Sequence, residues 1–139
     1  MISIELSVDR SVLLDILVDG MDYVCRGYWA QIEDYRWKWW YTVDKVGDPT
    51  GTINPELTGD TVLCRIRDDS DICAEKKNRP FVDITLNKLE EAFGWTLTHY
   101  PNVISDLEIV DEVVTDCNQD ADTQDVILQR IVLGEVVYG

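Results

Sequence analysis

Long apolar runs are missing from this sequence. No apolar segment approaches the roughly 20 residues that a helix needs to cross a membrane. The amino-terminal stretch MISIELSVDR also lacks the basic start and the apolar centre of a signal peptide. We therefore expect no membrane association and an intracellular protein.

Histidine and paired cysteines are equally scarce. The four cysteines (Cys25, Cys64, Cys73 and Cys117) form no Cys-x-x-Cys pair, and His99 is the single histidine. A structural zinc site needs four such ligands in close pairs, so we expect no metal site and reduced cysteines that pack as small apolar side chains. No GxSxG or phosphate-loop motif accompanies the histidine, and we expect neither an enzyme nor a cofactor.

Positive charge is nearly absent from the carboxyl-terminal third. The chain carries 27 acidic and 12 basic side chains, for a net charge of −15, and Arg130 is the only Lys or Arg after Lys88. Such a surface repels nucleic-acid phosphates, so we expect no direct DNA or RNA binding. The acidic surface fits a solvated face that keeps the protein soluble, and it also fits a face that binds a basic host protein or imitates DNA.

The patterning that is present indicates a single α+β domain over residues 1–139. Its composition, 45% hydrophobic and 28% charged, is ordinary for a folded globular protein. Strand-like alternation occurs in segments 2–7, 35–43 and 62–67, whereas segment 102–119 has no clear period. We expect a mostly antiparallel sheet with helices packed on one face, the first and last helices sharing the sheet that contains segments 2–7 and 35–43.

Three helices are expected from apolar residues at helical spacing. The first begins at a cap on Asp9 or Ser11 and ends at Gly20. The second is capped by Thr85, and the last follows an acidic run and stops at Gly134.

The acidic run before the last helix resembles a calcium-binding loop in part. Oxygen-bearing side chains stand at loop positions one, three, five and seven, namely Asp116, Asn118, Asp120 and Asp122. Ala121 stands where that loop needs a glycine, and Ile127 stands where it needs a bidentate glutamate. Capping of the last helix by Asp120 or Asp122 explains the same residues more simply.

Aromatic and cationic residues gather in the run YRWKWWYTV, which spans residues 35–43 and holds three of the five tryptophans. As a strand, this run places Trp37 and Trp39 on the face that packs into the core. Trp40 then remains beside Arg36 and Lys38 on the other face.

Two further arginines share one face of the strand expected at 62–67. If this strand neighbours the aromatic run, an indole is available to stack on a base, and guanidinium groups are available for a phosphate. The candidate ligand site is therefore Tyr28, Trp29, Arg36, Lys38, Trp40, Arg65 and Arg67. The alternative is that these residues form cation–π and salt-bridge contacts on an exposed sheet.

Two segments carry a resemblance to a known family. The segment SVLLDILVDGMDYVCRGYWAQIE contains the pair Tyr28-Trp29, and DADTQDVILQRIVLGEVVYG contains Gln129 and a GE[IV]VYG ending. In both respects the chain resembles a family of small uncharacterised proteins from tailed phages and prophages. The resemblance covers the two ends of the chain and implies a phage origin, but no particular activity.

A phage origin without catalytic motifs gives three functional hypotheses. The first is a counter-defence protein in the host cytoplasm that sequesters a small nucleotide-derived signalling molecule. The second is an acidic decoy that inhibits a host nucleic-acid-binding defence protein, and the third is a structural or assembly accessory without a ligand. The 9% aromatic content also predicts a homo-oligomer, most simply a two-fold dimer.

Overall fold

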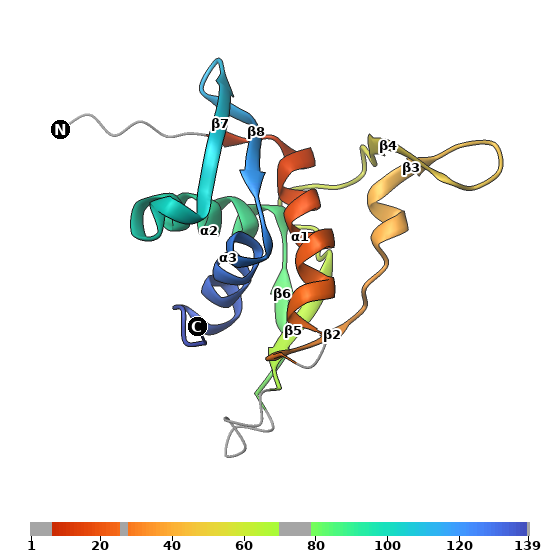
Figure 1. Ribbon diagram of the computed structural model, residues 1–139. Coiled ribbons are helices and arrows are strands. Elements are labelled where there is room, and N and C mark those ends of the chain that lie inside the picture. Colours follow the sequence, from red (N-terminus) through yellow and green to blue (C-terminus); the bar gives the residue numbers. More distant parts are fainter. Residues whose placement is uncertain (1–6, 26–27, 70–78, 139) are drawn as a thin grey trace.

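The computed structural model describes residues 7–25, 28–69 and 79–138 (Figure 1). Three α-helices within these ranges contact one another: α1 (Arg10–Val24), α2 (Leu86–His99) and α3 (Ala121–Leu133). Short 3-10 turns form η1 (Trp37–Trp40) and η3 (Pro101–Val103). The strands of the described ranges are β1 (Ser7–Val8), β2 (Ala30–Glu33), β3 (Tyr41–Val43), β4 (Pro49–Ile53), β5 (Cys64–Asp68), β6 (Val82–Ile84), β7 (Ile104–Val110) and β8 (Val113–Gln119).

These strands form three small sheets. One sheet has the order β1-β8-β7, in which β8 runs parallel to β1 and antiparallel to β7. The second has the order β2-β5-β6 and is antiparallel throughout, and the third is the antiparallel hairpin of β3 and β4. The expected α+β class with mostly antiparallel sheets is therefore confirmed.

The composition of the sheets differs from the prediction. We expected segments 2–7 and 35–43 to share one sheet, and this is wrong, because β1 pairs with β8 whereas β3 pairs with β4 in a separate sheet. Residues 2–6 of the first expected strand lie outside the described residues, so the comparison rests on Ser7.

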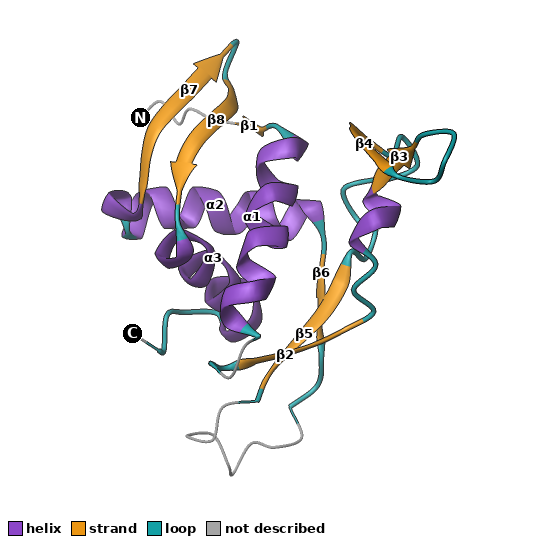
Figure 2. Cartoon of the chain, turned by 45° about the vertical axis from the view of Figure 1, so that its right-hand side comes forward, coloured by secondary structure: helices purple, strands orange, loops and turns teal. Residues whose placement is uncertain are grey.

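The helices lie between the two three-stranded sheets, and α3 contacts β5, β6 and β8 (Figure 2). Along β5 the side chains of Cys64, Ile66 and Asp68 are buried, whereas Arg65 and Arg67 point to the other face. The helices thus cover one face of this sheet. The segment Trp37–Ile53, which contains η1, β3 and β4 and which we call the arm, projects beside α1 (Figure 1).

Helix α1 begins where the sequence predicts, because the carboxylate of Asp9 accepts a hydrogen bond from the backbone N–H of Ser11 at 3.0 Å. The prediction that Gly20 ends this helix is wrong, since the helix continues past it. Gly20 instead lies where α1 crosses α3. A Cβ atom at this position would stand 2.8 Å from Cδ1 of Leu128 and 3.2 Å from Cβ of Gln124. The glycine therefore permits the close approach of the two helices.

The caps of the other two helices also agree with the prediction. The hydroxyl of Thr85 accepts from the backbone N–H of Lys88 at 3.2 Å. Asp120 and Thr123 form a capping box at the start of α3, and Gly134 ends that helix with a left-handed φ of 82°. The first half of the acidic run belongs to strand β8, so these acidic residues are explained by a strand and a helix cap.

The hairpin of β7 and β8 occupies the segment whose sequence showed no clear period. Val110 pairs with Val113 across a two-residue turn at Asp111 and Glu112, whose φ angles are 50° and 66°. Positive φ at both turn residues gives the backbone twist that tight hairpins favour. The usual sequence signal for this turn is Asn-Gly or Asp-Gly, and its absence explains why the sequence did not reveal the hairpin.

A buried hydrogen-bond network joins the two ends of the chain. The carboxylate of Asp125 accepts from Nε1 of Trp29 at 2.8 Å and from Nε2 of Gln129 at 3.0 Å. The amide oxygen of Gln129 accepts from the backbone N–H groups of Val137 at 2.8 Å and Tyr138 at 2.9 Å. The carboxyl-terminal residues are therefore held against α3 by side-chain hydrogen bonds.

The same network reaches the β2-β5-β6 sheet. The hydroxyl of Tyr138 donates to Oδ2 of Asp68 at 2.8 Å, and its ring stacks on Trp29 with the centroids 6.4 Å apart. We call Trp29, Asp68, Asp125, Gln129 and Tyr138 the C-terminal clasp. The clasp therefore joins the segment after α1 to β5, α3 and the carboxyl-terminal residues.

Replacing Gln129 by leucine tests the contribution of the clasp to stability. Gln129→Leu removes the acceptor of two backbone N–H groups and one of the two side-chain hydrogen bonds to Asp125, so we expect a loss of about 2–3 kcal/mol in the free energy of unfolding. Urea denaturation followed by circular dichroism measures this loss. The exposed Gln31 is the matched control, and Gln31→Leu should change stability by less than about 0.5 kcal/mol. Equal effects of the two substitutions would contradict the structural role of the clasp.

Candidate functional site

The tryptophan-rich run forms a 3-10 turn followed by a short strand, rather than one long strand. Trp40 is 1% exposed, and its ring meets that of Tyr35 edge to face with the centroids 5.5 Å apart. Trp37 and Trp39 are 36% and 48% exposed. The prediction that these two fill the core is wrong, because the turn has a period of three residues and the strand reading assumed a period of two.

Asn54, the residue that follows the arm, holds this turn in place. Its backbone N–H donates to the carbonyl oxygen of Trp40 at 2.9 Å, and its Nδ2 donates to the carbonyl oxygen of Trp39 at 3.0 Å. The backbone N–H of Trp39 donates to the carbonyl oxygen of Arg36 at 3.0 Å. The exposed indoles are thus carried by backbone that is hydrogen-bonded on both sides.

A pocket of about 400 Å³ lies on one side of η1. We call it the arginine pocket, and its lining combines a cation, two indoles, a carboxylate and two aliphatic side chains: Asp34, Arg36, Trp39, Trp40, Val62 and Leu63. The side chain of Arg36 is exposed and forms no ion pair within the described part of the chain. The volume falls within the range of small-molecule sites, roughly 300–1,000 Å³.

Arg65 lies at the edge of this pocket, but its charge is balanced. Its Nε donates to Asp83 at 2.9 Å, and one terminal nitrogen lies 3.2 Å from Asp34 and 3.9 Å from Glu33. The hydrogen bond and charge of Asp83 raise the pKa of the Arg65 guanidinium. Asp34 adopts a left-handed φ of 56°, a conformation uncommon for aspartate. Arg65 therefore orients Asp34 at the pocket rather than adding free positive charge.

The remaining predicted site residues lie in other surroundings. Nε of Arg67 donates to Oε1 of Gln31 at 2.9 Å, and the guanidinium sits 4.7 Å from the ring centroid of Phe81. Lys38 lines a separate recess together with Trp39 and Asn54.

Tyr28 and Trp29 do not line the arginine pocket, although we expected them as its walls. Trp29 is 1% exposed and belongs to the C-terminal clasp. The ring of Tyr28 lies against those of Tyr23 and Tyr138. Of the seven expected residues, the structure brings Arg36 and Trp40 into one pocket with Arg65 at its edge. It adds Asp34 and Trp39, which sequence reasoning missed because the strand reading turned Trp39 inward.

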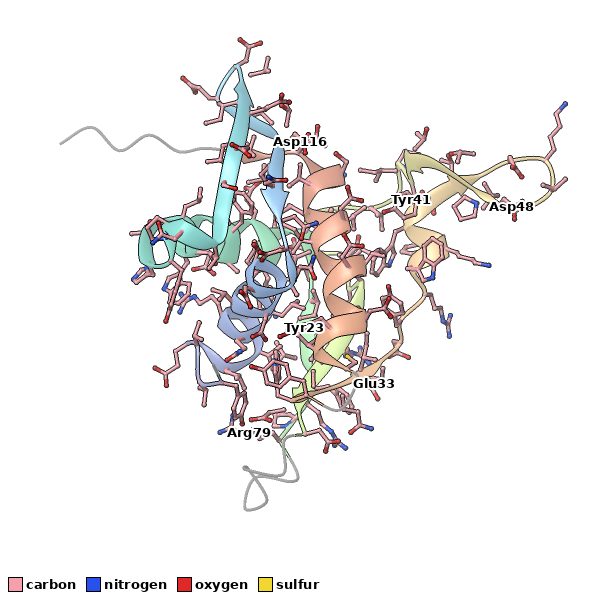
Figure 3. The ribbon with its side chains drawn as sticks, viewed as in Figure 1. Tyr23, Glu33, Tyr41, Asp48, Arg79 and Asp116 are labelled. Carbon is pink, nitrogen blue, oxygen red and sulfur yellow. The ribbon has the colours of Figure 1, made fainter. Side chains whose placement is uncertain are left out.

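A second recess, of about 330 Å³, separates the arm from the first helix. We call it the α1 groove, and α1 and the arm both contribute to its lining: Ser11, Asp15, Val18, Trp37, Tyr41, Pro49 and Gly51. Figure 3 shows Tyr41 on the arm beside α1. The two recesses therefore lie on different sides of η1, with Trp39 in one and Trp37 in the other.

The α1 groove lies in a strongly acidic environment. Partial burial, followed by the charges of Asp19 and Asp116, raises the pKa of Asp15 above its usual range. Burial, followed by the charges of Asp15 and Asp19, likewise raises the pKa of Tyr41. Figure 3 shows Asp116 on β8 near α1, so carboxylates from two elements contribute to this negative potential.

The cysteines of the described ranges offer no reactive thiol. Cys25, Cys64 and Cys117 are free, and burial raises the pKa of Cys64 to about 12 and that of Cys25 to about 11. A thiolate is required for nucleophilic or metal-binding chemistry, so these cysteines act as small apolar residues at neutral pH. Cys73 lies outside the described residues.

Comparisons with known proteins identify no relative. No family model matches the sequence, and neither the curated proteins nor the solved structures contain a significant match. Among residues 7–25, 28–69 and 79–138, no group of three or more His, Cys, Asp or Glu is placed to hold a metal ion. None of the helices in these ranges is long and apolar enough to span a bilayer.

Replacing Asp15 by asparagine tests the acidic environment of the groove. Because the pKa of Asp15 is higher in the folded protein than in the unfolded chain, its ionisation favours unfolding, and stability decreases as the pH rises through the folded-state pKa. We expect Asp15→Asn to stabilise the protein slightly at pH 7, by less than about 0.5 kcal/mol because solvent screens an exposed carboxylate.

Thermal unfolding at several pH values measures this effect. The difference from the wild type should vanish at a pH below the ordinary pKa of aspartate, where Asp15 is protonated in both states. Glu135→Gln, at an exposed carboxylate after α3, is the control for the loss of one surface charge. A destabilising effect of Asp15→Asn at pH 7 would contradict the proposed repulsion.

Proposed function

We propose that this protein binds a small nucleotide-like anion in the arginine pocket and sequesters it without converting it. The observation that carries the proposal is one pocket of about 400 Å³ that combines an exposed indole, Trp39, with the guanidinium of Arg36, which forms no ion pair with the described residues. An indole offers a stacking surface for a base, and a guanidinium offers paired donors for a phosphate. Trp40 forms part of the wall, and its burial leaves Trp39 as the stacking surface.

The pocket favours a ligand with few phosphates. Asp34 places a carboxylate in the lining, which can accept a hydrogen bond from a base amino group or a ribose hydroxyl but repels a second anionic group. Stacking contributes about 1–3 kcal/mol and a charge-assisted contact about 1.5–3 kcal/mol, from which the cost of association is subtracted. A single chain therefore binds weakly, and a homo-oligomer that supplies further contacts would bind more tightly.

The biological setting of the proposal comes from the resemblance to phage proteins. In that setting the protein acts in the host cytoplasm as a counter-defence factor, and its ligand is a nucleotide-derived immune signal. The proposal is one of binding only, with no catalytic step.

A second candidate function rests on the β7–β8 hairpin. This hairpin extends beyond the helices (Figure 1), and its exposed side chains include Asp106, Glu108, Asp111, Glu112 and Asp116. A row of carboxylates on a projecting hairpin suits an acidic decoy that occupies the basic surface of a host nucleic-acid-binding protein. A structural or assembly accessory is the remaining alternative if neither ligand nor host protein binds.

Titration calorimetry with a panel of cyclic and ADP-ribose-type nucleotides tests the first proposal. We expect at least one to bind the wild type, and Arg36→Ala and Trp39→Ala each to weaken its binding by about tenfold or more, because each removes one of the two main contacts. Arg67→Ala is the matched control and should bind like the wild type, since Arg67 is engaged by Gln31 and Phe81 outside the pocket.

Two results would contradict the first proposal. One is that no nucleotide in the panel binds the wild type, and the other is that all three variants bind as well as the wild type does. A complex with a host DNA-binding protein that weakens with salt, and with neutralisation of the hairpin carboxylates, would instead support the decoy.

A further inference from the structure

The walls of the α1 groove are aromatic and apolar. The rings of Trp37 and Tyr41 meet edge to face, with their centroids 6.4 Å apart, and both residues line the groove. Val18 from α1 and Pro49 from the arm add aliphatic surface. Trp37 is 36% exposed, so its ring is accessible to a ligand.

One carboxylate, Asp15, lines this otherwise apolar groove. Asp19 and Asp116 stand close enough to act on it electrostatically. In the described part of the chain, none of these three carboxylates lies within ion-pair distance of a lysine or arginine. The groove therefore combines aromatic rings with negative charge that no lysine or arginine of the described ranges neutralises.

We infer that the α1 groove binds the cationic side chain, arginine or lysine, of a basic partner polypeptide. The faces of Trp37 and Tyr41 attract a cation through their ring electrons. The methylene stem of such a side chain packs on Val18 and Pro49, and its charged head pairs with Asp15. This binding is independent of the proposed nucleotide site, which lies on the other side of η1.

Other occupants fit the groove less well. An anion is repelled by the three carboxylates, and a purely apolar group leaves Asp15 desolvated without a partner. A metal ion would find a single carboxylate in the lining, whereas cations such as Ca²⁺ take six or more oxygen ligands. A second copy of this chain brings its own net charge of −15 toward the acidic groove, whereas a basic polypeptide is attracted to it.

The cost of the unneutralised carboxylates supports the inference. Partial burial, followed by repulsion from Asp19 and Asp116, makes ionised Asp15 unfavourable in the free protein, and a cation in the groove offsets that cost. A substitution that removes the charge should therefore weaken binding without weakening the fold. Substitution of a residue with a purely structural role would instead lower the stability of the fold.

The experiment follows the indole N–H resonance of Trp37 in the full-length ¹⁵N-labelled protein during titration with capped tripeptides. We expect a glycine-arginine-glycine peptide to shift this resonance saturably, and the uncharged glycine-citrulline-glycine peptide to bind at least about tenfold more weakly. Asp15→Asn should weaken arginine-peptide binding by about tenfold while the unfolding temperature does not fall.

Two matched control variants distinguish peptide binding in the α1 groove from effects of surface charge and of the arginine pocket. Glu135→Gln removes a charge elsewhere on the surface and should leave peptide binding unchanged. Trp39→Ala alters the arginine pocket and should also leave it unchanged, so failure of the nucleotide proposal would be distinguishable from failure of this one.

Four results would overturn the inference. The citrulline peptide could bind as well as the arginine peptide, or Glu135→Gln could weaken binding as much as Asp15→Asn does. Spermidine could bind far more tightly than any arginine peptide, which would assign the groove to a free polyamine. The Trp37 resonance could shift with protein concentration alone, which would assign the groove to a second copy of the chain.

Discussion

The indole of Trp40 packs edge to face against Tyr35 inside the core, and its burial fixes the direction of the residues that precede it in η1. Trp37 lines the α1 groove, whereas Trp39 lines the arginine pocket beside Trp40. The two hydrogen bonds from Asn54 prevent the turn from rotating. The burial of Trp40 thus positions the exposed Trp37 and Trp39 in two recesses that differ in charge.

Charge decides what each recess accepts. The arginine pocket contains a guanidinium that no described carboxylate pairs with, and the α1 groove contains a carboxylate with two more nearby. The net charge of the chain is −15, so its surface potential is mainly negative. The guanidinium makes the arginine pocket locally more positive, whereas the carboxylates make the α1 groove more negative. The C-terminal clasp lies elsewhere, and it stabilises the body from which the arm projects. The stability of the fold and the chemistry of the recesses are therefore carried by different residues.

Much of the fold could be predicted from local patterns, and the sites could not. Caps on Asp9 and Thr85 are visible in sequence because they depend on residues a few positions apart. The β7–β8 turn was missed because its two positive-φ residues are acidic rather than asparagine and glycine. The tryptophan run was misread because alternating aromatic residues fit a period of two, and only tertiary burial of Trp40 selects a period of three. The clasp joins Trp29 to Gln129 through Asp125. These residues are far apart in the sequence, so no local sequence pattern predicts their contact.

The exposure of the individual tryptophans tests the central claim most directly. Fluorine NMR of the protein labelled with 5-fluorotryptophan, with resonances assigned by single Trp→Phe substitutions, reports how strongly a soluble gadolinium chelate broadens each indole. We expect strong broadening for Trp37 and Trp39, and little for Trp29 and Trp40. Strong broadening of Trp40 together with protection of Trp37 and Trp39 would restore the strand reading, and it would contradict the arrangement on which both recesses depend.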